Sequence, residues 1–197
     1  MRWKMICSDI STYILLILGQ RSYMTGISIE KISLNEIEEL RDISVNTFYE
    51  AFIWGNTEEN MQNYIRENFS TEKLSDELSD PHSVFYFARY NGKAAGYLKL
   101  NTGNAQKETL DGRGLEIERI YVLSELRGKN IGQLLFNKAV EKAKEDKLDY
   151  VWLGVWEKNP GAIRFYERNG MAAFSTHRFV LGTDVQTDIL MKMPLTR

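Results

Sequence analysis

The chain has 197 residues, of which 43% are hydrophobic and 26% are charged, and its formal net charge is −2. This composition is typical of one soluble globular domain with a sizeable core, and it excludes bulk electrostatic binding to nucleic acid. The single cysteine, Cys7, excludes an internal disulfide framework and favours a reducing, cytoplasmic location.

The first two dozen residues do not fit the pattern of the rest. Basic residues and a polar stretch precede the apolar run YILLILG. This run is too short to span a membrane, and no small-residue cleavage site of a signal peptide follows it. We therefore expect residues 1–25 to be an extension, with Met24 as the alternative true start, and residues 26–197 to form the domain. Attachment of the extension to a membrane surface is the less favoured alternative.

Alternating and helical patterns of apolar residues predict the secondary structure of the domain. The predicted elements, in chain order, are a strand over 27–32, a helix carrying Ile37 to Phe48, helices over 57–69 and 71–78, strands over 83–90 and 93–101, a loop over 102–114, a strand over 115–122, a helix from Gly132, a strand over 150–156, a helix over 162–169, and a hairpin of 172–181 and 184–193. This order predicts an α/β domain in which helices flank a mixed central sheet.

The stretch from Leu115 to Gly132 is the most informative part of the sequence. A strand of β-branched and aromatic residues runs into the loop RGKNIG, and a helix with apolar residues at helical spacing follows. The first N–H groups of a helix have no intrahelical partner, and the helix dipole adds positive charge, so this loop is suited to hold a phosphate or pyrophosphate. Arg127 and Lys129 add full charges beside it. A solvated basic turn is the alternative interpretation of this segment alone.

A second segment, YVWLGVWEKNPGAIRFYERNG over 150–170, favours the phosphate-binding interpretation over that of a solvated turn. A buried strand is followed by Asn159 as a helix cap, Pro160 at the first helical position, and a short helix that ends at Gly170. The two segments together resemble the GNAT acetyltransferase superfamily, whose loop pattern is Arg/Gln-x-x-Gly-x-Gly/Ala and whose later pattern is Asn, Ala, Tyr, Gly. The matching residues are Arg127, Gly132, Asn159, Ala162, Tyr166 and Gly170.

One loop position departs from the superfamily pattern, because Asn130 stands where its central glycine is expected. Asparagine tolerates a positive φ better than most residues, so the turn can still form. The resemblance implies a GNAT fold over most of the chain and direct transfer of acetyl from acetyl-CoA to a primary amine in a ternary complex. It also implies that the pyrophosphate lies on the loop amides and that the pantetheine arm runs along the preceding strand. The residues so assigned to the cofactor are Ile120, Tyr121, Val122, Arg127, Gly128, Lys129, Asn130, Ile131, Gly132, Asn159 and Tyr166.

Tyr166 and Glu118 are the predicted catalytic residues. By the resemblance, the Tyr166 hydroxyl lies near the sulfur and donates to the leaving thiolate; an aromatic core residue is the alternative. Glu118 is the candidate base, directly or through water, because partial burial raises the pKa of a carboxyl toward a useful range. Glu116, on the same face of the strand, is the less favoured base. Alternatively the two carboxylates form a solvated face, pair with Arg119 or Lys99, or orient a cationic amine.

Within the superfamily the chain is most similar to the PaiA-type spermidine/spermine acetyltransferases, and this predicts a small cationic amine as acceptor. The residues that carry the likeness are 115–121, 152–157, His177, Phe179, Gly182 and 186–188. The carboxylates expected in the acceptor groove are Glu116, Glu118, Asp111 and Asp188. The aromatic residues expected near the substrate are Phe48, Tyr49, Phe52 and Trp54.

Two other functions stay open at this stage: acetylation of protein N-termini or lysines, and a catalytically weak CoA-binding regulatory module. No cluster of histidine, cysteine and carboxylate residues has the spacing of a metal site, so no metal is expected. No nucleic acid or membrane is expected as partner, and a homodimer is left open.

Overall fold

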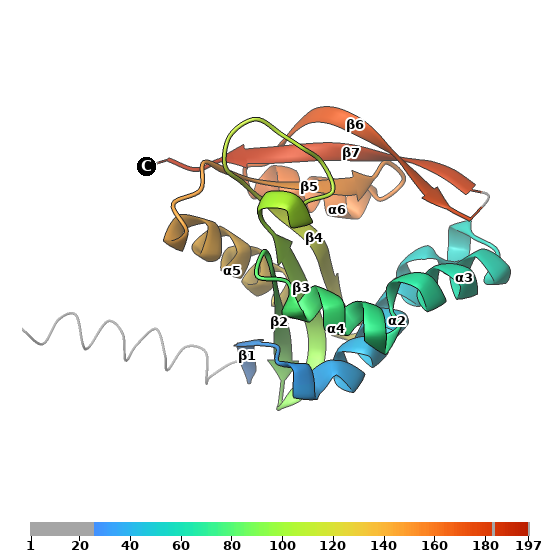
Figure 1. Ribbon diagram of the computed structural model, residues 1–197. Coiled ribbons are helices and arrows are strands. Elements are labelled where there is room, and N and C mark those ends of the chain that lie inside the picture. The colour runs from blue at the N-terminus through green and yellow to red at the C-terminus, as the bar shows by residue number, and fades with distance from the viewer. Residues whose placement is uncertain (1–25, 183, 197) are drawn as a thin grey trace, which may run out of the picture.

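A computed structural model describes residues 26–182 and 184–196. The expected extension over residues 1–25 lies outside the described residues. The described chain forms one seven-stranded sheet in the order β1-β2-β3-β4-β5-β7-β6, with helices on both of its faces (Figure 1). The predicted α/β class with a mixed central sheet is therefore confirmed.

The strands lie within one or two residues of their predicted ranges. They are β1 (Ile27–Lys31), β2 (Ser83–Tyr90), β3 (Lys93–Asn101), β4 (Gly114–Val122), β5 (Tyr150–Trp156), β6 (Ala172–Leu181) and β7 (Asp184–Pro194). β4 and β5 are parallel and every other neighbouring pair is antiparallel, with β7 inserted between β5 and β6. The predicted β2–β3 turn is confirmed, since Asn91 and Gly92 both adopt positive φ, as a type I′ turn requires.

The helices also follow the predicted order. They are α2 (Ile37–Phe52), α3 (Glu58–Asn68), α4 (Thr71–Ser79), α5 (Ile131–Glu145) and α6 (Pro160–Arg168), with the short 3-10 helices η1 (Leu34–Glu36), η2 (Ile53–Gly55), η3 (Gly103–Ala105) and η4 (Ser124–Leu126). α5 begins one residue before the predicted Gly132. α6 begins two residues before the predicted start, because the Asn159 side chain caps it at Pro160. Within the described residues no helix is long and apolar enough to cross a membrane.

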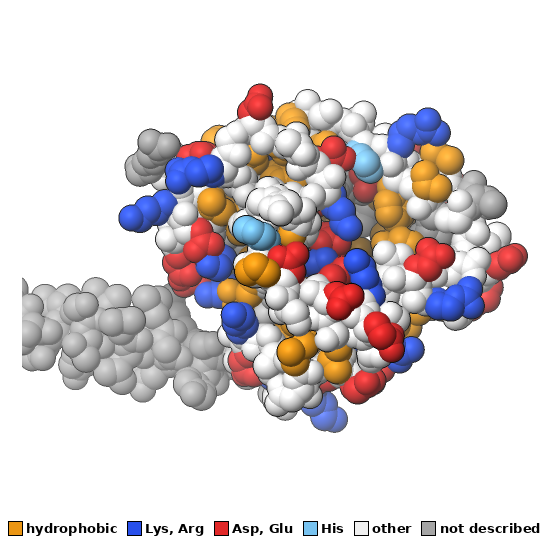
Figure 2. Space-filling model, viewed as in Figure 1, with side chains coloured by type: hydrophobic (Ala, Val, Ile, Leu, Met, Phe, Trp, Pro, Cys, Tyr) orange, Lys and Arg blue, Asp and Glu red, His pale blue; other side chains and the backbone are white. Residues whose placement is uncertain are grey.

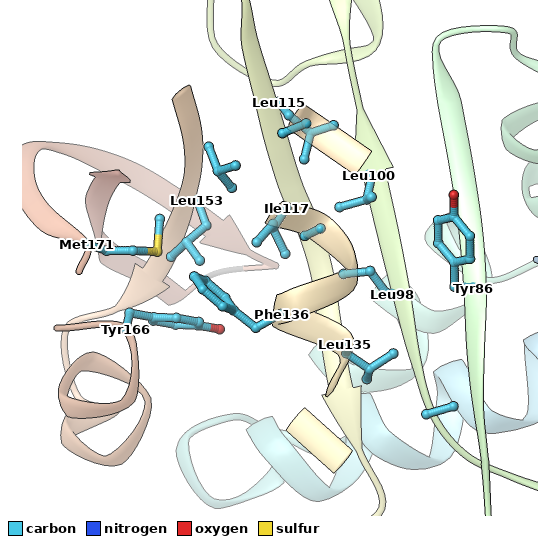
Figure 3. Close-up of a cluster of buried hydrophobic side chains, with 14 of the residues drawn as sticks. Tyr86, Leu98, Leu100, Leu115, Ile117, Leu135, Phe136, Leu153, Tyr166 and Met171 are labelled. Atoms are coloured by element: carbon cyan, nitrogen blue, oxygen red, sulfur yellow. The ribbon is translucent and has the colours of Figure 1, made fainter. Parts of the chain in front are cut away.

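The two larger of three hydrophobic clusters in the described residues lie on opposite faces of the sheet; the third consists of Tyr150, Trp152 and Leu190. α5 and α6 pack with one face, where Leu98, Ile117 and Leu153 meet Phe136 and Tyr166 (Figure 3). α2, α3 and α4 pack with the other face, in a core that includes Leu40, Phe48, Met61, Leu74, Phe87 and Tyr97. Successive strand residues point to opposite faces, so Leu98 enters the first core while its neighbour Tyr97 enters the second. Both cores reach the middle strands, and these strands are thereby held from two sides.

Candidate active site

The sheet opens between its two central strands. β4 and β5 pair only from Gly114↔Tyr150 to Glu116↔Trp152. Beyond Glu116, β4 continues beside β3 while β5 continues beside β7. A pocket of about 1300 Å³ runs along this opening, and both strands contribute to its walls. Figure 2 shows acidic and basic side chains gathered in the hollow of this face.

The β4–α5 loop forms one end of the pocket. Gly128 and Asn130 adopt positive φ of 83° and 66°, and Asn130 is the N-cap residue of α5. The turn thus forms with asparagine in place of glycine, as the sequence predicts. A Cβ at Gly128 would have no atom within 4 Å apart from those of its own chain neighbours, so the loop faces open space. The N–H groups of Ile131 and Gly132 lie in the first turn of the helix, where no intrahelical carbonyl can accept from them.

The side chains of this loop do not all face the pocket. Arg127, Gly128 and Gly132 line the pocket. The Lys129 ammonium instead lies 5.3 Å from the centre of the Tyr90 ring, and its side chain is outside the pocket lining. The Ile131 side chain is buried in the core. Lys129 and Ile131 can therefore serve a bound anion through their backbone N–H groups and not through contacts of their side chains.

The second half of β4 forms the long wall of the pocket. Ile120, Tyr121 and Val122 line it while they pair with β3 on their other side. Within the described residues, no strand pairs with the β5-facing edge of this segment. An extended ligand with amide groups can therefore add to this edge as a further strand does.

α6 places two of the predicted residues across the opening. The Asn159 side-chain oxygen accepts a hydrogen bond of 3.1 Å from the Ala162 N–H, so the helix-cap role holds and the side-chain NH₂ group stays available to a ligand. Tyr166 packs against Phe165 and Phe136, lines the pocket, and directs its hydroxyl toward β4 and α5 (Figure 3). Burial raises the pKa of Tyr166, so its hydroxyl keeps its proton at neutral pH and can donate a hydrogen bond.

A β-bulge in β4 sets the positions of two pocket carboxylates, Glu116 and Glu118. Leu100 pairs with Ile117 and Lys99 pairs with Arg119, which leaves Glu118 as the extra residue between them. Bulges re-aim the side chains around them, and they often occur next to active sites. The bulge accordingly interrupts the simple alternation that the sequence pattern assumes for this strand.

Glu118 belongs to a buried network of four charges. Its carboxylate lies 2.6 Å from the Lys99 ammonium and 3.6 Å from the Arg119 guanidinium. Glu77 of α4 completes the network, 3.0 Å from Lys99 and 2.9 Å from Arg119. The four side chains are only 4% to 9% exposed. Pairing with Lys99 and Arg119, one of the alternatives left open for Glu118, is therefore found. Lys107 adds a more exposed partner at 3.3 Å.

Glu116 lies near Glu118 but has different neighbours. One of its carboxylate oxygens accepts from the Asn101 side chain at 3.1 Å and from the Lys107 N–H at 3.0 Å. It lines the pocket, is 4% exposed, and makes no ion pair within the described residues. Asn101 also donates to Glu118 at 2.5 Å, so the two carboxyl groups share a neighbour.

The two carboxyl groups have opposite pKa shifts. Burial, with a smaller contribution from the charge of Glu118, raises the pKa of Glu116 to about 7. Burial also acts to raise the pKa of Glu118, but the positive charges of Arg119, Lys99 and Lys107 outweigh it and hold that pKa at about 2. Glu118 is thus a permanent anion, whereas Glu116 can take up and release a proton near neutral pH.

Aromatic rings from α2, α3 and β5 line the same pocket. Phe48 stacks on Tyr64 at 4.4 Å between ring centres, and Phe52 lies 6.1 Å from Trp156 of β5. All four rings line the pocket, together with the rim residue Trp54, which is 94% exposed. Tyr49 is not among the lining residues; its hydroxyl donates to Glu58. Three of the four aromatic residues expected near the substrate therefore line the pocket.

The expected acidic groove is partly found. Asp188 of β7 lines the pocket with Glu116 and Glu118, but Asp111 is not among the lining residues. His177 Nδ1 lies 2.5 Å from the Glu108 carboxylate, and this contact joins β6 to the loop before β4. The sequence alone does not predict this contact. Among the described residues, no group of histidine, cysteine and carboxylate side chains is arranged to hold a metal ion.

One sequence signal for the buried charges is present. Lys99 lies among apolar residues in YLKL, and Arg119 lies between apolar residues and Glu118 in IERIY. A charged residue in such a strand is rarely buried unless it is paired, so these two positions indicate buried partners. The sequence does not reveal that Glu77, which lies far from both in the chain, is one of them.

Comparison with known proteins identifies the class to which the fold and pocket belong. Residues 37–171 match the Acetyltransferase (GNAT) family. An "uncharacterized N-acetyltransferase in pepI 3′region" of Lactobacillus delbrueckii subsp. lactis is 42% identical over 172 residues, 87% of this chain and 99% of that protein. The chain therefore belongs to the GNAT family; it has the GNAT fold and is an N-acetyltransferase that uses acetyl-CoA.

Two more distant similarities concern named acetyltransferases. A spermidine N(1)-acetyltransferase of Thermoplasma acidophilum is 26% identical over 155 residues, 77% of this chain and 91% of that protein. The crystal structure of a PaiA N-acetyltransferase from Thermoplasma acidophilum in complex with coenzyme A superposes with a TM-score of 0.71 at 24% identity, covering 86% of this chain and 99% of the other. The structural likeness shows the shared fold.

Proposed function

We propose that the protein acetylates small cationic amines, with polyamines such as spermidine and spermine as the preferred acceptors. The observation that carries this proposal is one continuous pocket, in which an anion-suited loop and a free strand edge lead to buried carboxylates and aromatic rings. Carboxylates and aromatic faces both attract ammonium groups. The similarity to a protein named spermidine N(1)-acetyltransferase supports the choice of polyamines.

In this proposal acetyl-CoA is held largely by the backbone. The N–H groups of the loop from Gly128 to Gly132 bind the pyrophosphate, and the Arg127 side chain adds a positive charge. Ile120, Tyr121 and Val122 pair with the pantetheine arm through the free edge of β4, and the Asn159 NH₂ group adds a hydrogen bond. The open space at Gly128 and the unpaired edge of β4 fit a ligand of this shape.

Glu116 is the proton acceptor in this proposal, in preference to the Glu118 of the sequence-based prediction. An ammonium group must lose a proton before its nitrogen can attack the thioester carbonyl carbon. A base with a pKa of about 7 matches neutral pH, and the second carboxylate oxygen of Glu116 has no hydrogen-bond partner among the described residues. Glu118, held at a pKa of about 2 by its cationic neighbours, is a weak base.

Tyr166 is the proposed acid. When the amine nitrogen bonds to the acetyl carbon and the carbon–sulfur bond breaks, negative charge develops on the sulfur. The Tyr166 hydroxyl donates a proton to this sulfur, so CoA leaves as the thiol. Glu116 takes one proton from the ammonium group before the attack and later releases it to solvent; the nitrogen loses its second proton after the attack, and this proton restores the Tyr166 hydroxyl. Holding both reactants in one pocket supplies a further part of the rate enhancement, up to about 7–11 kcal/mol in the best intramolecular cases.

A thiol-release assay with acetyl-CoA tests the proposal. The acceptors compared are spermine, spermidine, small monoamines and peptides with a free N-terminus or lysine. Selective turnover of polyamines is expected. Turnover of peptides alone would replace the polyamine assignment with protein acetylation. Binding of acetyl-CoA without turnover of any amine would favour a regulatory CoA-binding module.

A further inference from the structure

Asp188 is a pocket carboxylate for which the proposed reaction has no use. It lies on β7, where it pairs with Trp156 of β5 on one side and His177 of β6 on the other. It lines the pocket, and its carboxylate makes no hydrogen bond or ion pair within the described residues. The neighbouring His177 is already engaged with Glu108. Asp188 is therefore a pocket anion without a cationic partner in direct contact.

The pocket wall beside Asp188 is recessed because β5 carries a glycine there. A Cβ at Gly154 would lie 3.5 Å from the Asp188 carboxylate and 3.5 Å from Leu190. Trp152 and Trp156, two residues away on either side, share the face of the strand on which that Cβ would stand. The absent side chain leaves a recess between two indole rings, with a carboxylate at its edge.

The electrostatics of the recess favour a cation. Burial raises the pKa of Asp188 while His177 opposes this shift, which indicates a carboxylate that is poorly solvated for its charge. An ammonium group beside it would restore the lost solvation. Of the two indoles, Trp152 is buried, whereas the Trp156 ring already has the Lys158 ammonium 5.9 Å from its centre and attracts charge of this kind. Backbone strain does not explain the glycine, since the φ of Gly154 lies outside the positive range.

We infer that Asp188 and the recess over Gly154 bind the second cationic group of the acceptor, so that the site selects amines with two or more positive charges; this inference rests on the proposed function. Trp152 pairs with Glu116, and Trp156 pairs with Asp188. The two rows are four residue steps apart along β5, about 13 Å at 3.3 Å per residue. The reacting nitrogen and the second ammonium group therefore lie at separate positions along a long acceptor.

Matched acceptors test this inference. Diaminooctane and octylamine have the same carbon chain and differ in the second amine. Asp188→Asn is expected to lower the ratio of kcat/KM for diaminooctane to that for octylamine about tenfold or more, since a charged hydrogen-bonding partner is lost. Gly154→Ala, which keeps all charges and adds one methyl group to the recess, is expected to lower the same ratio. Asp111→Asn, which removes a carboxylate outside the pocket lining, is the control.

A ratio that is unchanged in both Asp188→Asn and Gly154→Ala would overturn the inference, as would an equal fall for both amines. Calorimetric binding of spermidine to the CoA-loaded protein keeps the test independent of turnover. If wild type binds spermidine and Asp188→Asn binds it at least about tenfold more weakly, the subsite stands even where no acetylation is seen and the proposed function fails. If wild type does not bind spermidine, the inference is wrong.

Discussion

The two ends of the pocket are built by different means. The end proposed to bind acetyl-CoA consists largely of backbone groups from one continuous segment, residues 120–132, with α6 across from it. The end proposed to bind the acceptor consists of side chains from α2, α3 and four strands, which the fold brings together from distant parts of the chain. Backbone groups are present whatever the side chain, so the first end tolerates Asn130 in place of glycine. The second end depends on individual charges, so single substitutions there are expected to have larger effects.

Glu116→Gln should have the largest effect on the reaction. It removes the proposed proton acceptor and keeps the side-chain shape, so kcat should fall about a thousandfold while binding of CoA is retained. Steady-state kinetics together with calorimetric titration of CoA provide the measurement. A fall of less than about threefold would remove Glu116 from this role.

Glu118→Gln should affect stability most. It leaves Lys99 and Arg119 buried with only Glu77 to balance them, and the free energy of unfolding should fall by roughly 3–5 kcal/mol. Because the folded pKa of about 2 lies below the ordinary 4.5, the contribution of Glu118 is present above pH 4.5 and lost as the pH falls toward 2. Urea unfolding at several pH values measures this.

The matched control for this stability prediction is Glu141→Gln. Glu141 is exposed and forms an ion pair of 2.8 Å with Lys138 on the surface of α5. Loss of that pair should cost less than about 1 kcal/mol. Equal losses in the two variants would contradict the view that the buried network holds the acceptor end in place.

Tyr166→Phe tests the proposed role of the Tyr166 hydroxyl as the acid. The ring packing survives and only the hydroxyl is lost, so kcat should fall about a hundredfold with little change in KM for acetyl-CoA. Tyr49→Phe is the control, because the Tyr49 hydroxyl donates to Glu58 away from the pocket lining. An unchanged kcat in Tyr166→Phe would mean that the sulfur leaves without help from this residue.

Substitutions at Asn130 should have the smallest effects. Asn130→Gly should leave CoA affinity equal or slightly better, because glycine adopts the observed φ of 66° without strain. Asn130→Ala should weaken it by roughly fivefold to thirtyfold, since a left-handed alanine costs about 1–2 kcal/mol. A large loss in Asn130→Gly, measured by calorimetry, would reveal a contact of the asparagine side chain with the cofactor.

The same contrast explains which features the sequence predicts. The order of the elements and the β4–α5 loop follow from local patterns, since apolar periodicity and a loop before a helix are properties of neighbouring residues. The difference in pKa between Glu116 and Glu118 does not follow from local sequence patterns. It depends on the β-bulge and on the positions of Glu77, Lys99 and Arg119. When two carboxylates lie two residues apart, no local pattern predicts which of them will contact buried cations.

The dependence of kcat/KM for spermidine on pH, compared among wild type, Glu116→Gln and Glu118→Gln, tests the central claim most directly. The wild-type value should rise through an apparent pKa near 7, as Glu116 loses its proton and becomes able to accept one from the amine. That limb should be absent in Glu116→Gln and present in Glu118→Gln. A limb near 7 that persists in Glu116→Gln and disappears in Glu118→Gln would contradict the account.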